Sequence, residues 1–202
     1  MKPRLIVQQK LTAFVNKYKV LTPQPTGGPG TLVALAQQKR FAFKEKVMFY
    51  TDETRDKLAF TFRAEKIMDI HGRFFVEDAS GTTLGMFKKE FMKSLINSTW
   101  KVLDANGTEV LLVRESNQVL AIVRRFGSEL PLIGVVAELV LLFFKYHFVF
   151  VDVATGQEVG RYRKTTLLRD HYVLEFDDAT WNRLDWRVYA AVGVALDALQ
   201  SR

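Results

Sequence analysis

The sequence predicts a mainly β fold, a twelve-stranded β-barrel that encloses a hydrophobic C-terminal α-helix. Three observations support this prediction. Aspartate-containing turns recur at a nearly constant spacing, strand-like segments flank them, and a helical segment with no polar face lies near the end of the chain. Together they predict antiparallel hairpins wrapped around a buried helix.

The recurring turn is the clearest of these signals. Asp52, Asp78 and Asp104 are each 26 residues apart, and Asp177 follows Asp152 by 25. Aspartate opens a turn by accepting hydrogen bonds from backbone N–H groups, and glycine closes it in a left-handed conformation. This period accommodates two strands and two connections, so each unit is predicted to be a hairpin. A calcium loop is the alternative, but the Asp-x-x-Gly spacing lacks its alternating oxygen ligands.

Counting strand-like segments gives about twelve. The predicted strands are 3–9, 15–22, 31–38, 45–51, 57–64, 67–77, 82–88, 98–104, 108–114, 146–152, 157–164 and 171–177. The glycines of residues 22–30 form a loop and no phosphate-binding loop, because Pro29 removes an amide donor and no Gly-Lys-Ser/Thr follows.

The interval between Asp104 and Asp152 is 48 residues, long enough for one hairpin unit and an inserted apolar segment at about 117–144. Within it, residues 130–144 are apolar except for Glu138, and this run is shorter than a membrane span requires. We expect a buried or covering helix, and an interfacial membrane helix is the alternative.

The C-terminal segment predicts the central helix. Thr180 can cap a helix over about 181–199, and residues 188–196 within it have no polar face. A helix that is apolar on all sides must be enclosed. Its small residues would let the barrel wall approach closely; they are Ala190, Ala191, Gly193 and Ala195. Closing the strands around it removes the exposed edges that promote aggregation.

Composition limits the function classes. The chain has 202 residues and no cysteine, which excludes disulfides, thiolate metal sites and thiol catalysis. No signal-peptide pattern begins the sequence, so we expect a cytoplasmic protein that is at most peripheral to a membrane. Of the net charge of +7, the excess lies in residues 1–50, where nine Lys or Arg face one acid, Glu45. Such a segment could face an anionic surface, or it could be a solvated face.

Three segments carry a family resemblance: FFVEDASGTTLGMFKK, WKVLDANGTEVLLV and LDWRVYAAVGVALDAL. They resemble the LURP-one-related family, which is similar to the phospholipid scramblases and to the C-terminal domain of Tubby proteins. The resemblance covers nearly the whole chain, so residues 1–202 are predicted to form one domain. It implies a twelve-stranded barrel around a central hydrophobic C-terminal helix.

The resemblance implies less about activity than about fold. Tubby domains bind phosphoinositide headgroups through basic side chains, and scramblases are associated with calcium-stimulated lipid movement. This chain lacks the proline-rich region and the acylated cysteines of scramblases. The place of the scramblase calcium segment holds acids without a clear match to it: Glu175, Asp177, Asp178 and Asp185.

No catalytic or metal-binding motif is present in the sequence. His71, His147 and His171 form no HExxH-like pattern, and no Gly-x-Ser-x-Gly elbow occurs. The adjacent Asp177 and Asp178 suit the start of a helix. We therefore expect no catalytic residue, no metal and no cofactor, and no enzyme activity.

Two clusters mix cations with aromatic residues. Lys39, Arg40, Lys44 and Lys46 flank Phe41 and Phe43, and Lys88, Lys89 and Lys93 surround Phe87, Phe91 and Met92. Such a mixture could seat an anionic lipid headgroup; single-stranded nucleic acid, which would use a similar mixture, is the less favoured partner. The alternative is simple strand alternation, with rings facing the core and cations facing water. A weaker third group holds Lys164 and the pair Arg161 and Arg163, which share one strand face around Tyr162.

Two hypotheses for function follow. In the first, the chain is a non-enzymatic LURP-one-related protein of unassigned biochemical activity that binds anionic lipid headgroups through its basic N-terminal strands. In the second, it is a structural or protein-interaction domain that docks a protein partner through the inserted apolar segment, near Leu130 to Phe144.

Overall fold

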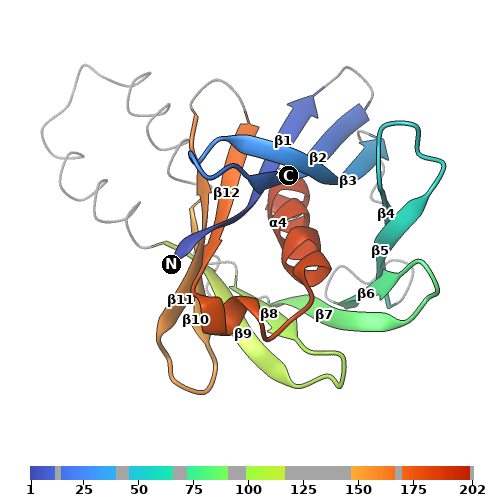
Figure 1. Ribbon diagram of the computed structural model, residues 1–202. Helices are drawn as coiled ribbons and strands as arrows, with labels where there is room; N and C mark the ends of the chain where they lie inside the picture. The colour runs from blue at the N-terminus through green and yellow to red at the C-terminus, as the bar shows by residue number, and fades with distance from the viewer. Residues whose placement is uncertain are drawn as a thin grey trace, which may run out of the picture.

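The computed structural model is a closed antiparallel barrel of twelve strands with a helix inside it (Figure 1). The structure describes residues 1–11, 15–39, 46–65, 72–90, 99–116, 147–166 and 170–200. The strands are β1 (Lys2–Leu11), β2 (Val15–Pro23), β3 (Pro29–Lys39), β4 (Lys46–Tyr50), β5 (Leu58–Ala64), β6 (Arg73–Asp78), β7 (Thr83–Glu90), β8 (Thr99–Leu103), β9 (Glu109–Glu115), β10 (Phe148–Asp152), β11 (Glu158–Lys164) and β12 (Asp170–Phe176). Helices α3 (Asp178–Trp181) and α4 (Trp186–Gln200) follow β12. The predicted fold class is confirmed; the inserted segment at 117–144 lies outside the described residues.

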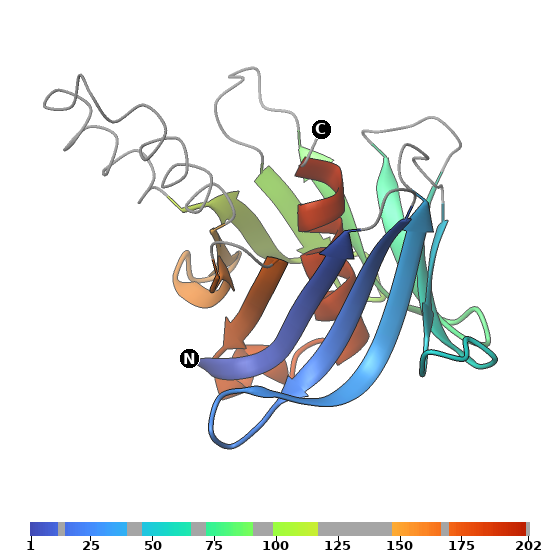
Figure 2. The ribbon, with the colours of Figure 1, turned by 90° about the horizontal axis from the view of Figure 1, so that it is seen from above.

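The strands follow one another around the barrel in sequence order, and β1 pairs with β12 to close it. The closing register runs from Lys2 opposite Phe176 to Gln9 opposite Asp170. Because the ring is closed, each of the twelve strands has a paired neighbour on both sides, although β3 and β4 pair only at Leu35 and Ala36. Viewed from above, α4 lies in the centre of the ring (Figure 2).

The turn prediction is confirmed in hydrogen-bonding detail. The Asp78 carboxylate accepts the backbone N–H groups of Ser80 and Thr82, each at 2.9 Å. Asp104 forms the same pair of bonds in the next hairpin. Gly81 closes the first of these turns with a φ of 91°, a conformation that glycine adopts without steric cost. The aspartates therefore serve as turn residues, and this fixes which hairpins lie at the same end of the barrel.

The core is the contact between the inner barrel wall and α4. Every residue from 188 to 198 of α4 is buried. Aromatic rings fill much of the surrounding wall, with Phe49 stacked on Phe60 at a centroid distance of 4.1 Å. A Cβ added to Gly193 would lie 3.0 Å from Leu174 Cδ1, so this small residue does let the wall approach the helix closely.

The predicted start of the central helix is wrong. Thr180 lies inside α3, where Asp177 is the cap and accepts the Thr180 N–H at 2.6 Å. The central helix begins at Trp186, and the carboxylate of Asp185 accepts the Arg187 N–H at 2.9 Å. An aspartate therefore precedes each helix and accepts a backbone N–H at its start, Asp177 for α3 and Asp185 for α4. Thr180, which we expected to cap one continuous helix, caps neither.

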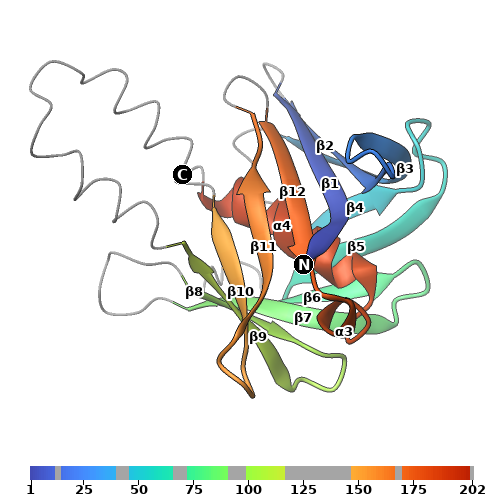
Figure 3. The same cartoon turned by 60° about the vertical axis from the view of Figure 1, so that its left-hand side comes forward.

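The start of β1 is tied to α3 by an ionic cluster. Lys2 Nζ lies 2.9 Å from the Asp178 carboxylate, and Arg4 also pairs with that carboxylate. Figure 3 shows the beginning of β1 beside α3. These two hydrogen bonds, to Lys2 first and to Arg4 second, lower the pKa of Asp178 from 3.8 to about 2. The cluster thus links the first strand to the segment that follows the last one.

Asp178→Asn is expected to lower the urea midpoint near pH 6 and to have a much smaller effect near pH 2. A carboxyl whose pKa is lower in the folded state stabilises the fold above its unfolded-state pKa. That contribution is lost as the pH falls through the folded-state value, here between 3.8 and about 2. Urea denaturation of both proteins across this range is the measurement. A difference between them that stays constant with pH would contradict the assignment.

Candidate functional site

One end of the barrel is rich in cations. We call the end with the aspartate turns the turn end and the opposite one the cationic end. We counted the charges in the three residues of each strand that lie nearest the cationic end. They comprise twelve cations and three acids. The cations are Lys10, Lys17, Lys39, Lys46, Arg63, Arg73, Lys88, Lys89, Lys101, Arg114, Arg163 and Lys164. The acids are Glu90, Glu115 and Asp170.

The first predicted cluster lies at the cationic end as far as it is described. Lys46 begins β4, is exposed, and stands opposite Arg63 of β5. Lys39 ends β3, opposite Val15, but its side chain is outside the description, and Arg40 and Lys44 lie outside the described residues altogether. That these four residues together contact an anionic headgroup therefore stays a prediction.

The second predicted cluster is divided between the two faces of β7. Lys88 faces outward, and its ammonium lies 3.0 Å from the Glu109 carboxylate. Lys89 faces inward, with Nζ 5.5 Å from the centroid of the buried Trp100 ring. Burial lowers the pKa of Lys89, and the charge of Glu115 opposes that shift. Strand alternation thus prevents Lys88 and Lys89 from forming one contact surface; Lys93 lies outside the described residues.

Sequence reasoning missed an exposed lysine pair on β1 and β2, at the cationic end. Lys10 and Lys17 stand directly opposite each other in the β1–β2 register, and both are exposed. Neither forms an ion pair with another described residue. Two residues further along β2, Lys19 pairs with Glu53. Like charges directly opposite on neighbouring strands are destabilising, so fold stability does not explain this pair.

Other opposed cations in the described strands are neutralised by acids. Lys88 stands opposite Lys101, and both ammonium groups pair with Glu109, at 3.0 and 2.8 Å. Arg63, opposite Lys46, forms a bidentate contact with Glu77 at 2.8 to 3.0 Å. Lys10 and Lys17 differ in forming no ion pair with an acid among the described residues; Glu53, whose pKa is lowered by its hydrogen bond to Lys19, also feels the weaker attraction of Lys17 and Lys10.

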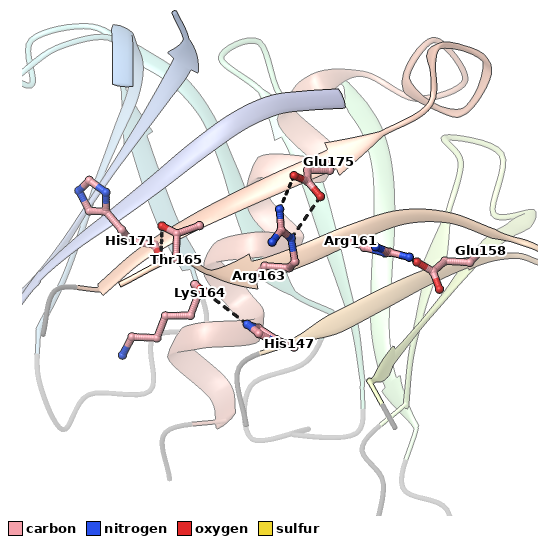
Figure 4. A network of polar contacts seen from close by, with 8 residues as sticks. All are labelled: His147, Glu158, Arg161, Arg163, Lys164, Thr165, His171 and Glu175. Carbon is pink, nitrogen blue, oxygen red and sulfur yellow. Dashed lines mark hydrogen bonds and ion pairs between the residues drawn. The ribbon is translucent and has the colours of Figure 1, made fainter. Parts of the chain in front are cut away.

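A pocket of about 240 Å³ lies on the outer wall of β9, β10 and β11. Arg114, Arg161 and Arg163 line it, and the latter two share the outer strand face, as alternation around Tyr162 predicts. Figure 4 shows that both are already bound, Arg161 to Glu158 and Arg163 to Glu175. The pocket is therefore nearly balanced in charge, which makes it a weaker anion site than the β1–β2 pair.

His147 borders the same pocket and is buried. Its Nε2 lies 3.3 Å from the Lys164 backbone oxygen (Figure 4). Burial lowers the pKa of His147; the hydrogen bond to Lys164 opposes the shift, and the charge of Arg163 adds to it. A neutral imidazole adds no positive charge to the pocket near neutral pH.

The acids at the position of the scramblase calcium segment are all engaged in protein contacts. Glu175 accepts hydrogen bonds from Arg163, and Asp185 accepts them from Arg187. Asp177 caps α3, and Asp178 binds Lys2 and Arg4. Among the described residues, no group of three or more His, Asp or Glu side chains is placed to hold a metal ion.

A comparison with models of protein families shows to which family the chain belongs. A model of the LURP-one-related family matches residues 33–197. The chain belongs to the LURP-one-related family. A search of curated proteins finds no match. The match to the LURP-one-related model includes Lys46, Lys88 and Lys89, whereas Lys10 and Lys17 precede it.

One further finding concerns membranes. In the part of this LURP-one-related chain that the structure describes, no helix combines the length and the apolar character needed to cross a bilayer.

Proposed function

We propose that this LURP-one-related chain is a non-enzymatic module that binds anionic lipid headgroups at a membrane surface through its cationic end. The observation that carries the proposal is the directly opposed, exposed pair of Lys10 and Lys17. Bringing two ammonium groups together costs stability in the free protein. An anion that contacts both removes this repulsion, so the pair favours binding.

The arrangement of the cations supports an extended surface as the partner. The strand ends that carry Lys10, Lys17 and Lys46 lie at one end of a closed ring. A flat anionic membrane can contact several of these strand ends at the same time. Each Lys or Arg near such a surface contributes about 1 kcal/mol, so a few contacts give useful affinity. Asp78, Asp104 and Asp152 of the hairpin turns lie at the other end, and Glu53 of the β4–β5 turn is already paired with Lys19.

Lys10→Glu/Lys17→Glu is expected to reduce binding to phosphatidylserine-containing vesicles at least about tenfold, because the loss of about 1 kcal/mol per lysine is compounded by repulsion from the new carboxylates. Co-sedimentation with phosphatidylcholine vesicles, with and without phosphatidylserine, measures the effect. Binding of the unmodified protein should weaken as salt is raised, because the charges are exposed.

A matched control is available at the turn end. Lys57 is exposed in the connection between β4 and β5, so Lys57→Glu makes the same kind of charge change outside the strand ends that form the cationic end. This variant should bind vesicles nearly as the unmodified protein does. Lys39→Glu/Arg40→Glu/Lys44→Glu tests the predicted neighbouring cluster. If all three variants bind like the unmodified protein, or if the unmodified protein binds no vesicle, the proposal is rejected.

A further inference from the structure

A second pocket lies at the turn end, away from the cationic end. Its volume is about 420 Å³, within the range of small-molecule sites. We call it the indole pocket; it is lined by Arg4, Leu5, Thr22, Val33, Trp181, Asn182, Leu184 and Trp186. Its walls come from β1, β2, β3 and the segment that joins α3 to α4.

The two indoles are fixed by the core on one side and remain half-buried. Trp181 stacks on Tyr189 with a centroid distance of 5.0 Å. Trp186 meets Phe60 edge to face at 5.7 Å. Such contacts hold the rings in place without covering them completely. The apolar part of the pocket is therefore preformed, which lowers the entropic cost of binding a ligand.

The polar side of the pocket carries positive charge. Arg4 lines it with its guanidinium 5.7 Å from the Trp181 ring, and only 13% of the Arg4 side chain is exposed. Lys2 and Arg4 share one carboxylate, that of Asp178, so the cluster has one positive charge in excess. The Arg4 Nε–H is buried and has no acceptor among the described residues. The guanidinium is thus not fully satisfied by Asp178, and its charge lies at the edge of the apolar pocket.

We propose that the indole pocket binds a small amphiphilic carboxylate, with its apolar body against Trp181 and Trp186 and its carboxylate beside the Arg4 guanidinium. The apolar walls provide the affinity for the body, and the excess positive charge selects an anionic head. The site lies at the opposite end of the barrel from Lys10 and Lys17. Binding there is independent of the vesicle binding proposed above.

Tryptophan fluorescence provides the test, because two of the three tryptophans line the pocket and the third, Trp100, is fully buried. The probes are octanoate, octan-1-ol and octylamine, which share an apolar chain and differ in the head group. Octanoate is expected to cause a saturable change and to bind at least about tenfold more tightly than the other two, because hydrogen bonds to charged groups are strong. No saturable change, or equal affinity for the three probes, would overturn the proposal.

Two variants locate the site. Arg4→Lys keeps a positive charge but replaces the planar guanidinium by a single ammonium group, so the preference for octanoate over octan-1-ol should fall at least about threefold. Val33→Phe places a larger side chain in the pocket and should weaken all three probes. Thermal unfolding verifies that each variant is folded, and Lys10→Glu/Lys17→Glu is the control that should bind octanoate normally. If octanoate binds Arg4→Lys and Val33→Phe as tightly as the unmodified protein, the ligand occupies another site and the proposal is wrong.

Discussion

Gly160→Val is expected to destabilise the barrel by about 3 kcal/mol or more, because it overpacks a closed core. Gly160 lies on β11 directly opposite Phe176 of β12. A Cβ at Gly160 would lie 2.3 Å from both Cδ1 and Cε1 of the Phe176 ring, far inside van der Waals contact. The ring cannot move away freely, because it packs against Phe150 at 4.8 Å and Tyr189 at 4.5 Å. Urea denaturation gives the free energy of unfolding.

Two comparisons separate this contact from a general effect of adding a side chain. Gly28→Ala, in the β2–β3 connection, places a Cβ 3.8 Å from the nearest atom, Gln24 Oε1, and should change stability little. In a double-mutant cycle, Gly160→Ala and Phe176→Leu should together cost less than the sum of their separate effects, because the smaller side chain relieves the clash. Additive costs in that cycle would show that the Phe176 ring is not the source.

The hairpin order could be predicted from the sequence because its causes are local. Asp78 and Asp104 accept hydrogen bonds from residues two and four positions later, so each turn is encoded within a few residues. The enclosed helix was also predictable, since a segment that is apolar on all sides has no surface to present to water. These two facts together specify a closed barrel.

The start of α4 and the face of each cation were harder to predict, for different reasons. Thr180 and Asp185 are both good capping residues, and only the packing of α3 decides between them. Lys88 and Lys89 are neighbours in sequence and therefore point to opposite faces of a strand. We grouped them because they are adjacent in sequence. The alternation of side chains along a strand would have predicted that they point to opposite faces.

Within each of the two proposed sites, the residues are brought together by strand register or by packing between distant parts of the chain. Lys10 and Lys17 meet because β1 and β2 pair in one particular register, which the sequence does not specify by composition. The indole pocket brings Arg4 and Val33 together with Trp186, which lies more than 150 residues further along the chain. No local pattern predicts such a contact, so the structure was needed to find it.

Asp197 is the one acidic residue among the buried residues 188–198 of α4, and its replacement by alanine is expected to cost about 2 to 5 kcal/mol. The side chain is only 3% exposed. Tyr18 donates its hydroxyl hydrogen to one carboxylate oxygen at 3.0 Å, and Tyr172 donates to the other at 2.6 Å. Burial raises the pKa of Tyr18, and the charge of Asp197 raises it further, so this phenol stays protonated and remains a donor. Asp197→Ala removes the acceptor of two hydroxyls inside the barrel.

A second variant distinguishes lost hydrogen bonds from a lost side chain. Tyr18→Phe/Tyr172→Phe/Asp197→Leu removes the carboxylate together with the two hydroxyls that donate to it, and it should be more stable than Asp197→Ala, because the buried hydroxyls no longer lack an acceptor; the part-buried Gln9 amide, which donates to Tyr18 at 3.0 Å, loses its partner. The carboxylate also joins β2, β12 and α4, so we expect it to fix the rotation of the helix within the barrel. Free energies of unfolding from urea denaturation are compared for the three proteins. If Asp197→Ala is as stable as the unmodified protein, or if the triple variant is the less stable of the two, the hydrogen bonds to Asp197 do not stabilise the fold.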